Sequence, residues 1–346
     1  MKKILFITTG GTIASSEGDN GLEPSFDAEE LLAHIPEIRD LCDINGKLVM
    51  NIDSTNMRPT SVKKIAETVF ENYDDYDGFV VTHGTDTMGY TSSLLTYMLS
   101  NIKKPVVVTG SQVAIGQPYT DAKKNISDAV RFALEGVPGI FVAFDGKIIN
   151  GTRAIKMRSK SMNAFESINR PYVASIKLGK ITYNGDSRGN EYENEYEIMN
   201  IDPSEPFRLR TDLCTDVFVL KLYPGIDPDI FDFIKENYKG LVIETFGLGG
   251  IPNLEDYNIV SKVKEVIEAG VVVAVTTQCV EEGVNLGVYE VGRDLAEHNK
   301  AIITGDMNTE AIVGKLMWAL GNFNNLSDVK CFMETPIFGD MSVEEK

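Results

Sequence analysis

The chain has 346 residues, a length typical of two domains, and 43% of them are hydrophobic, which allows sizeable cores. Its formal net charge of −18 excludes a broadly basic surface, so we expect neither nucleic acid nor an anionic membrane as a partner. The apolar run at the N-terminus is too short for a signal peptide and no later segment could span a bilayer, so we expect a cytoplasmic protein.

Strands and helices alternate along the first half of the chain. Short apolar runs predict strands at residues 2–8, 47–53, 77–85, 104–111 and 139–146. Apolar residues at helical spacing predict helices at 27–38, with Asp27 as N-cap, and at 60–73, 90–102 and 121–136. This order is typical of a doubly wound, mostly parallel sheet. We expect residues 1–185 to form this larger α/β domain, with the catalytic groups on it.

The composition changes at residues 186–212, an acidic and polar stretch that we interpret as a linker. A second α/β run follows it. Strands are predicted at 216–225, 240–250, 270–278 and 301–307, and helices at 229–238, 254–270 and 308–323. Residues 213–346 are therefore expected to form a second, smaller α/β domain with a parallel sheet.

The cysteines and histidines indicate no metal chemistry. Because no two of the four cysteines lie close together in the sequence, we expect free thiols, with Cys279 an inert one. The three histidines are scattered, and no spacing of His, Cys and carboxylate residues is typical of a metal site. We expect neither a metal nor a cofactor.

Three predicted strands of the first domain end in loops of small and polar residues, at 8–12, 53–56 and 82–87. In a parallel sheet, the loops at the carboxyl ends of the strands share one edge, where ligands bind. The stretch "GTRAIKMRSKS", residues 151–161, follows another strand and can bring Lys156 to the same edge. Side chains that are distant in the sequence would then meet in one pocket.

Such a pocket would hold two threonines, a carboxylate and a lysine. A threonine hydroxyl is a poor nucleophile unless a base removes its proton, and lysine can be that base when its pKa is lowered. Asp86 would orient the lysine or bind a substrate ammonium group, and the glycines before Thr12 would aim N–H groups at an oxyanion. We interpret His83 as structural, because Thr85 and Asp86 beside it already fit the chemistry.

Two motifs, "ITTGGTIA" and "GFVVTHGTDTM", resemble the signature motifs of the asparaginase/glutaminase family, in the family's order and at its usual separation. The resemblance extends to "IDSTNM", "GTRAIKMRSKSMNAFES" and "TTQCVEEGVNLGVYEVG", and so covers essentially the whole chain. Within the family, the sequence is most similar to the cytoplasmic, type I L-asparaginases.

This resemblance implies an amidohydrolase that converts L-asparagine and water to L-aspartate and ammonia without a cofactor. Thr12 would be the nucleophile that forms an acyl-enzyme. Thr85, Asp86 and Lys156 would form a second catalytic group, and the region of Gly11 and Thr85 would supply oxyanion donors. The substrate-binding residues implied are Gly11, Asp53, Ser54, Thr55, Thr85 and Asp86. The family also implies a homodimer or homotetramer.

Two positions depart from the family pattern. Many members carry a tyrosine on the loop after the first motif, where this chain has Leu22, which cannot polarise Thr12. Either another tyrosine such as Tyr289 enters the pocket, or the lysine group carries more of the activation. Glu244 stands where an arginine would help to hold a carboxylate, so we do not expect an allosteric asparagine site.

Three alternatives stay open at this stage. A glutaminase-asparaginase of broader specificity differs only in accepting one more methylene, which a pocket discriminates by about 1–3 kcal/mol. The amidase subunit of an aminoacyl-tRNA amidotransferase usually carries an additional N-terminal region, and this chain begins directly at the motif strand. A non-catalytic amino-acid-binding protein would have no need of hydroxyls, Lys156 and Asp86 in one place.

Overall fold

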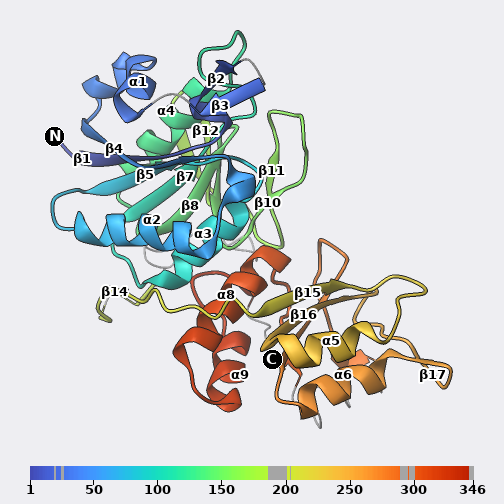
Figure 1. Cartoon of the computed structure of the whole chain (residues 1–346). Coiled ribbons are helices and arrows are strands. Elements are labelled where there is room, and N and C mark those ends of the chain that lie inside the picture. Colours follow the sequence, from blue (N-terminus) through green and yellow to red (C-terminus); the bar gives the residue numbers. More distant parts are fainter. Residues whose placement is uncertain are drawn as a thin grey trace. The chain divides into compact units, whose positions relative to one another are not determined.

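The computed structural model describes residues 1–18, 21–24, 27–185, 201–202, 204–288, 295 and 301–342, without the side chains of 15–18 and 21–24. By its contacts the chain forms two units, which are coloured along the sequence in Figure 1. The first unit comprises Met1–Thr211 and Ile337–Gly339, and the second comprises Asp212–Pro336 and Asp340–Lys346.

An eight-stranded sheet forms the centre of the first unit, in the order β13-β12-β9-β8-β7-β5-β1-β4. Its strands are β1 (Lys3–Gly10), β4 (Asp43–Ile52), β5 (Gly78–Thr82), β7 (Pro105–Thr109), β8 (Gly139–Phe144), β9 (Lys147–Asn150), β12 (Ala174–Lys177) and β13 (Lys180–Tyr183). The strands from β4 to β8 are parallel to one another, whereas the pairs β8–β9, β9–β12 and β12–β13 are antiparallel. The predicted mostly parallel sheet is confirmed, with an antiparallel edge that the strand–helix alternation did not predict.

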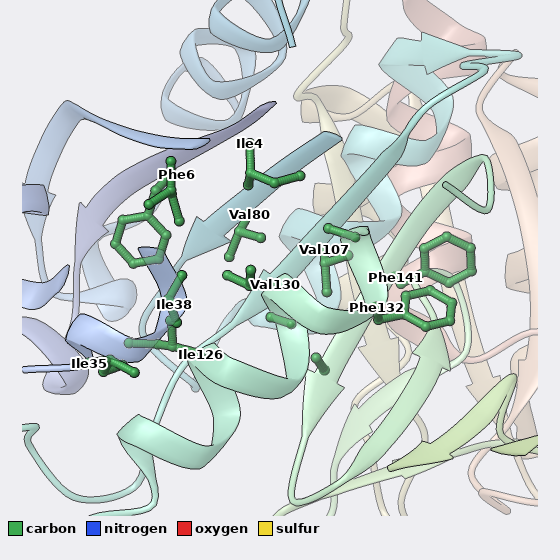
Figure 2. Packing of buried hydrophobic residues seen from close by; sticks show 14 of the residues in the cluster. Ile4, Phe6, Ile35, Ile38, Val80, Val107, Ile126, Val130, Phe132 and Phe141 are labelled. Atoms are coloured by element: carbon green, nitrogen blue, oxygen red, sulfur yellow. The ribbon is translucent and has the colours of Figure 1, made fainter. Parts of the chain in front are cut away.

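Helices cover both faces of this sheet, which is why β5 and β7 are buried at every residue. The helices are α1 (Ala28–Ala33), α2 (Pro59–Glu71), α3 (Met88–Met98) and α4 (Ala122–Ala133). Figure 2 shows Ile126 and Val130 of α4 packed against Val80 and Val107 of the sheet, with Ile35 beside them. Helices α2 and α3 pack together on the opposite face (Figure 1).

The first helix is shorter than predicted. Asp27 caps it as expected: its side chain accepts the Glu30 N–H, and the Glu30 side chain accepts the Asp27 N–H. The helix ends at Ala33, because Pro36 forces the preceding Ile35 out of the helical region, to φ −137° and ψ 60°. A 3-10 helix, η2 (Pro36–Asp40), replaces the last predicted turn.

Smaller elements of the first unit lie mostly in segments for which the sequence predicted none. They are the hairpins β2–β3 (Ser15–Gly18, Gly21–Pro24) and β10–β11 (Ala154–Lys156, Phe165–Ser167), the pair β6–β14 (Leu99–Ser100, Arg208–Leu209), and the 3-10 helices η1 (Thr12–Ala14) and η3 (Ser54–Asn56). Strand β14 lies inside the predicted linker. It forms a separate two-stranded sheet with β6, and its contacts place residues 208–209 in the first unit.

The second unit holds a smaller, fully parallel sheet in the order β15-β16-β19-β20. Its elements are β15 (Val217–Lys221), α5 (Ile230–Asn237), β16 (Gly240–Thr245), β17 (Asn253–Leu254), β18 (Tyr257–Asn258), α6 (Ile259–Glu268), β19 (Val272–Thr277), η5 (Leu286–Val288), β20 (Ile302–Ile303), α8 (Thr309–Asn322) and α9 (Leu326–Glu334). Helices α5 and α6 share one buried cluster with the sheet, and α8 and α9 share another. The helix predicted from residue 254 begins only at Ile259, because Asn258 caps it and the hairpin β17–β18 precedes it.

The four cysteines are free thiols, as predicted. Within the ranges that the structure describes, no helix combines the length and the apolar character needed to cross a membrane.

Candidate active site

The candidate site lies at the point in the large sheet where the strand order reverses. Strand β1 pairs with β4 on one side and with β5 on the other, although the chain visits them in the order β1, β4, β5. The connections that follow β1 and β4 therefore run toward opposite edges of the sheet. In doubly wound sheets, the crevice at the carboxyl ends of the strands at such a point is where ligands bind. The predicted threonine and carboxylate residues all lie in the loops after these three strands.

Close glycine packing brings these three loops together. Gly11 has φ +81°, and a Cβ atom there would overlap the backbone nitrogen and Cα of Gly84. Gly84 in turn leaves no room beside Ser54, because a Cβ on it would lie 2.5 Å from the Ser54 Oγ. The loop after β1 therefore touches the loop after β5, which touches the loop after β4. Side chains larger than hydrogen would push these loops apart.

His83 fixes the turn that precedes Thr85. The ring is fully buried, with Nδ1 2.6 Å from the Gly84 carbonyl oxygen and Nε2 2.9 Å from the Thr91 Oγ1. A carbonyl oxygen can only accept, so Nδ1 carries the proton and Nε2 accepts from the Thr91 hydroxyl. Burial lowers the pKa of His83 to about 4, which keeps the ring neutral. These contacts support the interpretation of His83 as structural.

Three of the predicted site residues meet directly. The Lys156 Nζ donates to the Thr85 Oγ1 at 2.7 Å and to the Asp86 Oδ1 at 2.7 Å. The Lys156 side chain is 18% exposed, whereas that of Asp86 is 54% exposed and can meet a ligand from solvent. Thr85 is buried. The resulting arrangement is a hydroxyl held by a lysine that is itself oriented by a carboxylate, which is the general form of an activated hydroxyl group.

The hairpin β10–β11 delivers Lys156 to this position. Lys156 pairs with Phe165 across the hairpin, and Phe165 packs on Phe144 of β8 with ring centroids 4.9 Å apart. Backbone bonds flank the pair, since the Met157 N–H donates to the Ala164 carbonyl oxygen at 2.8 Å. Sequence analysis placed Lys156 at the correct edge but did not predict the hairpin.

Gln112 is a site residue that the sequence analysis missed. The Thr85 hydroxyl donates to the Gln112 Oε1 at 3.3 Å, and the Gln112 Nε2 donates to the Ser161 carbonyl oxygen at 3.2 Å. The hydroxyl proton of Thr85 thus points to Gln112, because its oxygen already accepts from Lys156. The available signal was that Gln112 follows β7, the strand next to β5 in the sheet.

The loop after β4 has a firm internal structure. The Asp53 Oδ1 accepts from the Thr55 N–H at 2.7 Å and from the Thr55 hydroxyl at 2.6 Å, and these bonds lower the pKa of Asp53. Ser54 is buried, its Oγ accepts the Asp86 N–H at 3.3 Å, and its carbonyl oxygen accepts from the Thr87 hydroxyl at 2.9 Å. Ser54 thus joins this loop to the loop of Thr85.

The amide of Gly11 is engaged within the protein. The Gly11 N–H donates to the Ile52 carbonyl oxygen at 3.0 Å, so Gly11 contributes close packing. Thr12 follows it at the start of η1 and is partly exposed. Leu22 lies on β3, but its side chain is outside the described ones, as is the whole of Tyr289.

The position of Glu244 in the second unit argues against carboxylate binding there. Its Oε1 accepts from the Thr309 hydroxyl at 2.6 Å, and the Glu310 carboxyl group lies near enough to repel it. A ligand carboxylate would meet negative charge at this place. Among the side chains that the structure describes, no three His, Cys, Asp or Glu residues gather as metal ligands do.

Comparison with known proteins agrees with this geometry. Residues 3–188 match the model of the asparaginase N-terminal domain, and residues 216–333 match that of the glutaminase/asparaginase C-terminal domain. An L-asparaginase of Thermococcus kodakarensis is 39% identical over 98% of this chain and 99% of its own length. A glutamyl-tRNA(Gln) amidotransferase subunit of Pyrococcus abyssi is 37% identical over 99% of this chain and 77% of its own length.

Solved structures are similar over the same extent. The thermostable L-asparaginase from Thermococcus kodakarensis superposes with a TM-score of 0.90 at 38% identity, covering 99% of this chain and 100% of that one. L-asparaginase I from Vibrio cholerae superposes with a TM-score of 0.86 at 29% identity, covering 99% of each chain. Both halves of the sequence match the family, and hydroxyls, a lysine and a carboxylate meet at one edge of the sheet. The chain therefore belongs to the asparaginase family of amidohydrolases.

Proposed function

We propose that this protein is an L-asparaginase, which hydrolyses the side-chain amide of L-asparagine to L-aspartate and ammonia. The contact of the Lys156 Nζ with the Thr85 Oγ1 and the Asp86 Oδ1, each at 2.7 Å, carries the proposal. Similarity to an L-asparaginase across 99% of that protein's length supports it. The proposal includes a homodimer or homotetramer and a cytoplasmic location.

The reaction proceeds in two steps with Thr12 as the nucleophile. Its Oγ attacks the amide carbon, the C–N bond breaks, and the proton of the hydroxyl leaves with the nitrogen as ammonia. Water then attacks the resulting ester, and its proton returns to the Thr12 oxygen as aspartate departs. Thr85 and Lys156 serve as the proton relay in this proposal, because the Thr85 Oγ1 and the Lys156 Nζ are in contact at 2.7 Å.

The loops after β4 and β5 hold the rest of the substrate in this proposal. Asp86 binds the α-ammonium group, for which its half-exposed carboxylate is suited. Asp53, Ser54 and Thr55 contact the remaining α-amino and α-carboxylate atoms. The bonds from Thr55 that lower the pKa of Asp53 favour its charged form, as ammonium binding needs.

Two other activities are chemically close. Glutamine is one methylene longer than asparagine, a difference worth about 1–3 kcal/mol in a pocket, or about 10–200-fold in kcat/KM. Amidotransferase subunits of similar sequence make delivery of ammonia to a second reaction the other candidate.

Ammonia release from the purified protein tests the proposal. We expect turnover of L-asparagine at least tenfold above that of L-glutamine, with Thr12→Ala losing at least 10³-fold in kcat, as removal of a nucleophile does. Normal turnover by Thr12→Ala would reject the nucleophile, and equal turnover of both amides would favour the broader specificity. An asparagine-dependent rise in Tm without ammonia release would instead indicate a binding protein.

A further inference from the structure

The carboxylate of Glu166 lies at the centre of a polar cluster that the proposed reaction does not use. Its Oε1 accepts from the Arg158 Nη1 at 2.7 Å, and its Oε2 accepts from the Lys147 Nζ at 2.9 Å. The Tyr172 hydroxyl donates to the same Oε2. Only 22% of the Glu166 side chain and 19% of the Lys147 side chain are exposed, so these two groups are largely shielded from solvent, whereas Arg158 is half-exposed.

The cluster joins three segments around the hairpin that carries Lys156. Lys147 is the first residue of β9 in the main sheet, and Tyr172 lies between the hairpin and β12. Arg158 lies two residues after Lys156 and also donates to the Asn163 carbonyl oxygen at 2.8 Å. Glu166 itself lies on β11, opposite Ile155 and one residue away from the partner of Lys156. Its contacts therefore tie both strands of the hairpin to the sheet.

The negative charge of Glu166 strengthens these contacts. Burial alone would raise the pKa of Glu166, but the bonds from Tyr172, Lys147 and Arg158 outweigh burial and lower it to about 2. The carboxylate is thus charged at neutral pH, and each of its bonds is charge-assisted. Removing it would leave two cations facing each other in a partly desolvated site, so the hairpin would have to move.

We propose that Glu166 is a positioning residue for the reaction, because its bonds to Lys147 and Arg158 hold the hairpin so that the Lys156 Nζ reaches the Thr85 Oγ1. This inference rests on the proposed function only for its kinetic consequence. Glu166 bonds no residue of the substrate-binding loops after β4 and β5, and Ser54 holds the Asp86 backbone independently of Lys156, so loss of Glu166 should affect the chemical step more than substrate binding.

The first test is the kinetics of Glu166→Ala. We expect kcat to fall about 10–100-fold, as for a misplaced catalytic group, while KM for L-asparagine changes less than about twofold. Glu166→Gln keeps the shape and one acceptor, and should lie between this variant and the original protein. Asp232→Ala is the matched control, because Asp232 accepts from Lys235 and Lys262 at 3.0 Å each but lies in the second unit. Its kcat should be unchanged.

A second test does not depend on activity. Acetic anhydride acetylates amines according to their exposure, and mass spectrometry can compare Lys156 with Lys239, whose side chain is 71% exposed, in the same sample. In Glu166→Ala and Glu166→Gln, the acetylation of Lys156 relative to Lys239 should rise at least threefold. In Asp232→Ala it should stay constant.

The two tests distinguish the proposed function from the positioning role of Glu166. If the protein releases no ammonia from asparagine, the proposed function fails, and the acetylation ratio alone decides the role of Glu166. An unchanged ratio in both Glu166 variants would overturn the inference. So would a fall in kcat accompanied by a parallel rise in KM, because that pattern would mean general damage to the site.

Discussion

The backbone of Gly11 lies directly against the backbone of Gly84, at a distance that admits no side chain on Gly11. Gly11 precedes Thr12, and Gly84 precedes Thr85. Two loops that are more than 70 residues apart in the sequence are thereby held in one place, each with a threonine immediately after the contact. The packing of two glycines accounts for the proximity of both signature motifs.

Gly11→Ala should therefore separate the motifs. The new Cβ would overlap Gly84, and φ +81° is unfavourable for alanine, so we expect a loss of at least about 2 kcal/mol in unfolding free energy. Ammonia release should fall more steeply than stability. Urea unfolding and activity assays check this, with Gly116→Ala as control because its Cβ would meet nothing within 4 Å. A stable, active Gly11→Ala variant would contradict the close packing.

Stability should depend on pH through His83. Burial lowers its pKa to about 4, below the unfolded value of 6.5, so the unfolded chain binds a proton first as the pH falls. Stability is then fully present above pH 6.5 and is lost between pH 6.5 and 4, by up to about 1.4 kcal/mol per pH unit from this group. Urea unfolding at several pH values should show a shallower dependence in His83→Gln. An identical dependence in the variant would mean that His83 titrates normally.

Glu310 should have the opposite effect in the second unit. Desolvation raises its pKa to about 7, with repulsion from Glu244 adding to it, although a position in the first turn of α8 favours a negative charge. The folded chain therefore keeps this proton while the unfolded chain releases it near pH 4.5. Stability falls as the pH rises from 4.5 to 7, and Glu310→Gln should avoid this loss. The variant should match the original protein at pH 4.5 and exceed it at pH 8, and a constant difference would contradict the raised pKa.

The sequence predicted the core of the fold because its signals are local. The continuous apolar run of β5 and the Asp27 cap with Glu30 three residues later identify their elements without the rest of the chain. The meeting of Thr85, Asp86 and Lys156 followed from strand order and the family motifs together. The hairpin that carries Lys156 could not be predicted, because each of its strands has only three residues and the hairpin is held by distant partners such as Lys147.

The individual hydrogen bonds of the site also could not be predicted from the sequence. Oxyanion donors are expected in the region of Gly11 and Thr85, and the structure shows that the Gly11 amide donates to Ile52 of the neighbouring strand. Glycine motifs indicate that a backbone comes close to something, but they do not reveal whether that is a ligand or another loop. Here Gly11 touches Gly84, and the motif serves to join two loops.

The last prediction concerns Gln112, which accepts the hydrogen bond of the Thr85 hydroxyl. The Thr85 hydroxyl donates to the Gln112 Oε1, and the Gln112 Nε2 reaches the carbonyl oxygen of Ser161 in the hairpin loop. Gln112→Leu keeps the approximate volume but removes both bonds, each worth about 1 kcal/mol. We expect kcat/KM to fall about 5–30-fold, because the Thr85 hydroxyl then loses its acceptor and is free to rotate. Gln117→Leu, a change in the adjacent turn, should leave kcat/KM within twofold. Equal kinetics of Gln112→Leu and the original protein would show that Lys156 alone orients Thr85.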